Sequence, residues 1–161
     1  MVHEKKVYEL TIFGMDILSL DLNHWCQPNS KKSAASILFA MMIHWPIKSI
    51  EELWTPNLKY YTGFDDAKDL LTTTKVMLET LRKCLSDQDH DFSLTIKYYS
   101  VSRHNGLLSK INETDVHVVI QYTEDLLNEI DSAVFYWSLL HCTYELSFFD
   151  LLIYWMIMLS H

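Results

Sequence analysis

Glycine and proline are scarce in this chain, with three of each among 161 residues. Both residues normally mark turns and linkers, and glycine-rich loops hold phosphate groups in many nucleotide-binding folds. Their scarcity favours continuous secondary structure and leaves no natural place for a domain boundary. We therefore expect residues 1–161 to form a single domain, long enough to bury a hydrophobic core without metal ions or disulfide bonds.

The net charge of the chain limits the classes of binding partner that we expect. The formal net charge is −8, which repels a polyphosphate backbone, and the densest basic clusters are the pairs Lys5–Lys6 and Lys31–Lys32. We therefore expect no nucleic-acid partner. An acidic surface favours solubility and fast encounter with basic proteins.

The cysteines indicate a reducing compartment. Their number, three, is odd, they show no C-x-x-C spacing, and no apolar signal segment follows Met1. We expect reduced thiols in the core at Cys26, Cys84 and Cys142 of a soluble, cytoplasmic protein, since free cysteine is among the most buried residue types.

The N-terminal segment alternates between apolar and polar residues on both sides of residues 13–16, which contain Gly14 and Asp16. Period two on both sides of a short segment with glycine and aspartate predicts a β-hairpin. The alternating apolar residues are Tyr8, Leu10 and Ile12, then Leu18, Leu20 and Leu22. An amphipathic helix is the competing interpretation, since Leu10, Phe13, Ile17 and Leu20 also recur at a spacing of three to four.

Three helices are predicted in the next part of the chain. The first, capped by Ser30 or Ser33, runs through residues 34–43 and ends near Trp45, because Pro46 disfavours helical geometry before it. A short helix follows at 47–54. The clearest amphipathic pattern predicts a helix at 65–85, with acidic residues at its start. Its apolar stripe comprises Leu70 or Leu71, Thr74, Met77 or Leu78, Leu81 and Leu85.

Two strands are predicted beyond this helix. Alternation and many β-branched and aromatic residues indicate strands at 92–101 and 116–122, and Asn105–Gly106 favours a turn after the first. The expected class is therefore α+β: a helix-rich single domain with a small antiparallel sheet. An all-α bundle is the alternative.

The C-terminal part reads as helix again, with Leu126 or Leu127, Ile130, Val134, Trp137 and His141 on one face. Residues 146–159 are apolar nearly all round, but Asp150 interrupts them, and 151–159 is about half of the roughly 20 residues that span a bilayer. We expect a core helix and no membrane partner. A membrane helix or a subunit-docking helix is the weaker alternative.

The sequence contains few motifs that indicate catalysis, metal binding or cofactor binding. The chain has no G-x-G-x-x-G, phosphate-loop, G-x-S-x-G or H-E-x-x-H pattern. His24, Cys26 and His44 could meet, but a structural zinc site normally needs four ligands. The D-x-D-x-D spacing of residues 87–91 resembles the start of a calcium loop, but Phe92 replaces the required glycine. We expect no catalytic residues, metal site or cofactor.

Acidic residues and aromatic residues remain as candidate binding groups. We expect a non-catalytic protein-binding module that captures a basic protein partner, as an acidic inhibitor or an immunity-type protein does. The candidate partner-binding residues are Asp87, Asp89, Asp91, Asp65, Asp66, Asp69, Trp54, Tyr60 and Tyr61, with Tyr99 as a further exposed aromatic. The alternatives are a small enzyme or metal-binding protein that uses the His/Cys cluster, and a viral antagonist of a host factor.

Overall fold

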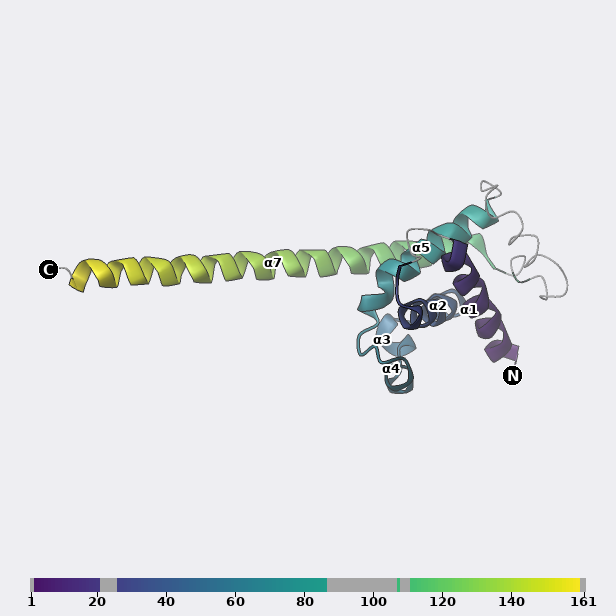
Figure 1. The fold of residues 1–161 in the computed structure, drawn as a ribbon. Coiled ribbons are helices and arrows are strands. Elements are labelled where there is room, and N and C mark those ends of the chain that lie inside the picture. Colours follow the sequence, from purple (N-terminus) through teal and green to yellow (C-terminus); the bar gives the residue numbers. More distant parts are fainter. Residues whose placement is uncertain (1, 21–25, 87–106, 108–110, 160–161) are drawn as a thin grey trace. The chain divides into compact units, whose positions relative to one another are not determined.

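The computed structural model describes residues 2–20, 26–86, 107 and 111–159, and the side chains in these ranges except those of residues 2–4, 20, 84 and 139–159. By its internal contacts the chain divides into two compact units, Met1–Glu124 and Asp125–His161. The described elements are all helices (Figure 1): α1 Val2–Leu20, α2 Asn29–His44, α3 Ile50–Leu53, α4 Pro56–Thr62, α5 Lys68–Leu85 and α7 Glu113–Leu159. The expectation that residues 1–161 behave as one domain stays a prediction.

The α+β class predicted from the sequence is wrong, and the alternative of an all-α fold fits. The predicted strand at 116–122 lies within α7, and the predicted N-terminal hairpin is replaced by α1. The described residues contain no strand. The predicted strand at 92–101 and the turn at Asn105–Gly106 lie outside the described residues.

The buried residues of helix α1 follow the helical spacing that was the alternative to the hairpin. Leu10, Phe13, Ile17 and Leu18 are all fully buried, and their spacing of three, four and one places them on one face of an α-helix. Gly14 lies on the same face, in close contact with the side chains of Phe39 and Met77. The residue expected to turn the chain instead allows α1 to approach α2 and α5 closely.

Helix α2 packs against both α1 and α5 (Figure 1). It is the helix predicted for residues 34–43, and it ends before Trp45 and Pro46 as expected. The predicted cap at Ser30 or Ser33 is wrong, because the helix already begins at Asn29. Its buried side carries both small and large residues: Ala34, Ala35, Ser36, Leu38, Phe39, Ala40, Met42 and Ile43. This mixture allows neighbouring helices to interlock at native packing density.

Helix α5 confirms the clearest prediction from the sequence. Leu70, Leu71, Met77, Leu78 and Leu81 are fully buried. The helix begins at Lys68 rather than at residue 65, so Asp65 and Asp66 lie in the preceding loop. The short helix predicted at 47–54 is α3, whose first turn is capped by the Ser49 hydroxyl, which accepts a hydrogen bond from the Glu52 N–H at 3.4 Å.

The first turns of α7 complete the core of the Met1–Glu124 unit. Val116, Val119, Ile120 and Thr123 are buried at helical spacing. The Ile50 N–H at the start of α3 donates a hydrogen bond to the Tyr122 hydroxyl at 3.2 Å. Lys75 of α5 forms an ion pair with Glu124 at 3.1 Å.

Charge is distributed unevenly along the chain. All 13 lysine and arginine residues precede α7, where they are matched by an equal number of acidic residues. Helix α7 has no lysine or arginine, and it contains Glu113, Asp115, Glu124, Asp125, Glu129, Asp131, Glu145 and Asp150. The whole formal net charge of −8 therefore lies on this one helix.

The Asp125–His161 unit consists, in its described part, of the remainder of α7. Large apolar side chains are exposed at Val134, Phe135, Tyr136 and Trp137. Among the described residues, no helix is both long enough and apolar enough to cross a membrane.

Candidate protein-binding surface

Helix α4 lies on the surface of the first unit, and none of its residues is buried. Its sequence still specifies a helix. Pro56 occupies the first turn, where its missing N–H is not needed. Gly63 ends the helix in the left-handed conformation, with φ of 75°, and its N–H donates to the Lys59 carbonyl at 2.9 Å. Pro56 and Gly63 thus mark the two ends of a helix whose side chains do not contribute to the core.

Two tyrosines of α4 are its most prominent feature. Tyr60 and Tyr61 are each 83% exposed, and their rings meet edge to face, with centroids 5.3 Å apart and planes at 80°. The exposure predicted for these two residues is confirmed. Aromatic rings held this far in solvent are a feature of protein interfaces.

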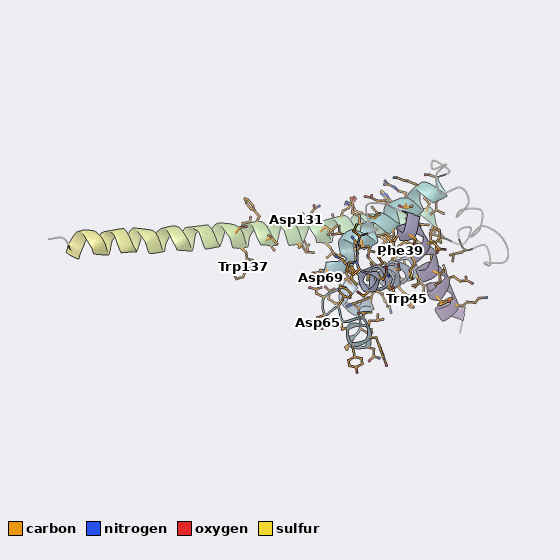
Figure 2. The ribbon with its side chains drawn as sticks, viewed as in Figure 1. Phe39, Trp45, Asp65, Asp69, Asp131 and Trp137 are labelled. Carbon is orange, nitrogen blue, oxygen red and sulfur yellow. The ribbon has the colours of Figure 1, made fainter. Side chains whose placement is uncertain are left out.

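Three carboxylates follow α4 in the chain, and all three are exposed. Asp65 and Asp66 lie in the loop before α5, and Asp69 lies in its first turn (Figure 2). Asp66 Oδ1 also accepts a hydrogen bond from the Lys68 N–H at 2.9 Å. Asp69 interacts favourably with the positive end of the α5 dipole. These residues combine a local structural role with an exposed negative charge.

The prediction that Trp54 is an exposed binding residue is wrong, because only 2% of it is exposed. Its indole Nε1–H donates a hydrogen bond to the Phe64 carbonyl at 2.9 Å. A buried indole normally needs such a partner. Trp54 therefore fixes the chain between α4 and Asp65 rather than contacting a partner.

A second contact fixes the same segment, and sequence reasoning missed it. The Thr62 hydroxyl donates to the Leu58 carbonyl at 2.6 Å and accepts from the Phe64 N–H at 3.4 Å. A threonine directly before glycine at the end of a helix is the signal that was available. Together with the Trp54 hydrogen bond, this contact holds the end of α4.

Several candidate residues are not brought into this surface. Asp87, Asp89, Asp91 and Tyr99 lie outside the described residues, as does His24. Cys26 is exposed, so the expectation of a core thiol at this position is wrong. The rings of His44 and Trp45 (Figure 2) pack edge to face, with 4.5 Å between their centroids. Within the described part of the chain, no three His, Cys, Asp or Glu side chains are arranged to hold a metal ion.

The sequence pattern predicts only part of the exposed apolar turn at 134–137 of α7. That pattern places Val134 and Trp137 on an apolar face but gives no role to Phe135 and Tyr136. The sequence signal for this turn was the succession of four large apolar residues within a single turn of helix.

Comparison with known proteins adds no further assignment: no protein-family model, curated protein or solved structure matches this chain significantly.

Proposed function

We propose that this chain is a non-catalytic protein-binding module that captures a basic partner through Tyr60, Tyr61, Asp65, Asp66 and Asp69. We call these residues the tyrosine–aspartate surface. The observation that carries the proposal is the 83% exposure of both tyrosines on a helix that buries none of its residues. Capture of a basic protein in this way is how an acidic inhibitor or an immunity-type protein would act.

The side chains of the surface favour arginine over other basic groups. A guanidinium group stacks on the face of a tyrosine ring and also forms paired hydrogen bonds with a carboxylate. A lysine ammonium group lacks the planar, bidentate geometry. Lys59 and Lys68 lie in the same stretch and are exposed, so the local net charge is small. Stacking on the tyrosines therefore has to contribute alongside charge.

The way the surface is held supports the proposal further. The Trp54 hydrogen bond to Phe64 and the Thr62 contacts restrain the segment that joins the tyrosines to the aspartates. A restrained surface loses less conformational entropy when a partner binds. The overall charge of −8 adds long-range attraction, which raises the rate of encounter with a basic protein.

Binding of a fluorescein-labelled nona-arginine peptide, measured by fluorescence anisotropy, tests the proposal against a nona-lysine peptide. At about 150 mM salt, where exposed charges more than roughly 8 Å apart are largely screened, the arginine peptide should bind more tightly. The double variant Tyr60→Ala/Tyr61→Ala should lose about tenfold or more in affinity for the arginine peptide, as truncated interface anchors do. Ile47→Ala is the matched control, since Ile47 is also an exposed apolar residue, at 98%.

The carboxylates need a control for charge alone. Asp65→Asn/Asp66→Asn and Glu51→Gln/Glu52→Gln remove the same formal charge from exposed positions. The amide introduced by Asp66→Asn retains an oxygen that can accept from the Lys68 N–H. The aspartate variant should weaken arginine-peptide binding more than the glutamate variant does. Equal affinity for both peptides, together with no effect of the tyrosine variant, would show that the proposal is wrong.

A further inference from the structure

One turn of α7 presents large apolar side chains on every side. Val134, Phe135, Tyr136 and Trp137 are 62%, 63%, 67% and 73% exposed. Successive helical residues are separated by about 100°, so four of them encircle the helix. Soluble chains rarely leave an apolar patch of more than a few hundred Å² uncovered, and larger patches mark interaction sites.

Helix α7 also lacks the features that stabilise a helix without neighbours. Because it contains no lysine or arginine, its acidic residues have no such partner three or four positions away within the helix. Phe, Tyr, Trp and Ser, which together make up 11 of the 28 residues 132–159, are weaker helix formers than Ala, Leu or Lys. Most helical stability in proteins comes from packing of an apolar face. The continuous helix therefore indicates a packing partner.

The residues of this part of α7 follow a seven-residue repeat. When Leu127 is assigned to position a and Ile130 to position d, nine of the ten a and d positions between 127 and 158 are apolar, with His141 as the exception. The a and d residues are Leu127, Ile130, Val134, Trp137, His141, Tyr144, Phe148, Leu151, Trp155 and Met158. A sustained 3.5-residue apolar period is the pattern of helices that supercoil around one another.

The acidic residues of this segment occupy particular positions of the same repeat. Asp125, Glu129 and Asp150 fall at positions c and f, away from the apolar stripe, and Asp131 and Glu145 fall at position e. The g positions contain no charged residue over this range; they are Leu126, Ala133, Leu140, Ser147 and Tyr154. Between parallel helices, an e residue of one helix faces a g residue of the other. Identical parallel helices therefore bring each acidic e residue next to an uncharged one, without repulsion.

We propose that the occupant of this apolar face is a second copy of the chain, so that residues 125–159 of α7 assemble in parallel with the same segment of other copies. Two identical stripes are self-complementary, whereas a lipid surface would have to accommodate Glu145 and Asp150 within the apolar stretch. A basic partner would contact the acidic c, e and f positions instead. Aromatic residues bury about 150–250 Å² each, so four at a and d positions approach the roughly 800 Å² per partner of a stable interface.

Sedimentation equilibrium of the full chain tests the assembly directly. The wild-type protein should sediment at a multiple of the 19.0 kDa monomer mass. Val134→Glu/Trp137→Glu, which places charge at an a and a d position, should shift the mass to that of the monomer. Asn128→Glu/Ser132→Glu adds the same charge at exposed positions shortly before this turn, at positions b and f, and should leave the oligomer intact.

Three outcomes would overturn the proposal. The first is a wild-type chain that stays monomeric at tens of micromolar. The second is equal dissociation of the two double variants, which would implicate net charge rather than the apolar stripe. The third is a monomer that floats with phosphatidylcholine vesicles. Because Tyr60→Ala/Tyr61→Ala leaves α7 unchanged, loss of peptide binding and loss of assembly are separate results.

Discussion

Gly14 provides a sharp test of how the first unit is packed. A Cβ atom added at this position would lie 2.9 Å from Met77 Sδ and 3.0 Å from Phe39 Cδ1. Favourable contacts between such atoms are about 3.5–4.0 Å apart. Both neighbouring side chains are fully buried, so neither can move without displacing others.

Two opposing effects determine the stability of Gly14→Ala. Alanine is favoured over glycine inside a helix by about 1 kcal/mol. Inserting a methyl group into a packed core costs about 1–3 kcal/mol. Since two contacts shorten by at least half an ångström relative to about 3.5 Å, we expect packing to dominate. The free energy of unfolding should fall by about 1 kcal/mol.

Urea unfolding followed by circular dichroism at 222 nm measures this change. Ser19→Ala is the control, because it raises helix propensity at an exposed position of the same helix and should be neutral or slightly stabilising. In a Met77→Ala background the closest contact of the new methyl group is absent. The double variant should therefore lose less stability than the two single variants together, by about 0.5–3 kcal/mol.

The opposite result would refute the packing argument. If Gly14→Ala stabilises the protein by the full helix-propensity difference of about 1 kcal/mol, and shows no coupling to Met77, then α1 does not approach α5 as described.

Three further substitutions test other contacts, each by urea unfolding. Leu78→Ala should cost about 2–5 kcal/mol, because the side chain is fully buried; a loss below about 0.5 kcal/mol, the range of surface substitutions, would place it on the surface. Trp54→Phe should cost about 1–3 kcal/mol by leaving the Phe64 carbonyl without its indole donor, whereas an unchanged midpoint would mean that this bond does not stabilise the fold. Tyr122→Phe should cost about 1 kcal/mol through the lost acceptor for the Ile50 N–H, and a neutral result would indicate that water replaces the hydroxyl.

Sequence patterns predict helices best where a single period is present. In α5 the leucines fit a helical spacing and no other; the predicted burial of Leu78 and Leu81 is confirmed, whereas Leu85 is only half-buried. In α1 two patterns overlap: Leu10, Ile12, Leu18 and Leu20 fit period two, whereas Leu10, Phe13, Ile17 and Leu20 fit period 3.6. The hairpin pattern assigns Gly14 to a turn, although its role is to allow close helix packing. Local pattern alone does not distinguish these two uses of glycine.

The strand predicted at 116–122 fails for a different reason. Its valines and isoleucine have high β propensity, and tertiary packing overrides such preferences. The start of α7 is marked in the sequence by Asn112 before Glu113 and Asp115. The Asn112 side chain accepts a hydrogen bond from the Thr114 N–H at 3.1 Å, as a residue preceding a helix does. This capping residue is the sequence signal that favours a helix over a strand.

The candidate binding surface was predictable in part. The segment between Pro56 and Gly63 contains a single aliphatic residue, Leu58, which favours exposure of Tyr60 and Tyr61. The burial of Trp54 depends on the Phe64 carbonyl, ten residues later. A single sequence contains no signal for such a contact, because it is set by how the chain folds back on itself.

The absence of lysine and arginine from α7 has a practical consequence for proteolysis. Trypsin cleaves after these two residues, and the last of them is Lys110. Tryptic digestion should therefore leave residues 111–161 uncut, whether this helix is folded, assembled or unfolded. Chymotrypsin, which cleaves after aromatic residues, has sites within residues 135–137. Protection of those sites from chymotrypsin reports whether the aromatic turn is covered, and trypsin serves as the built-in reference digestion.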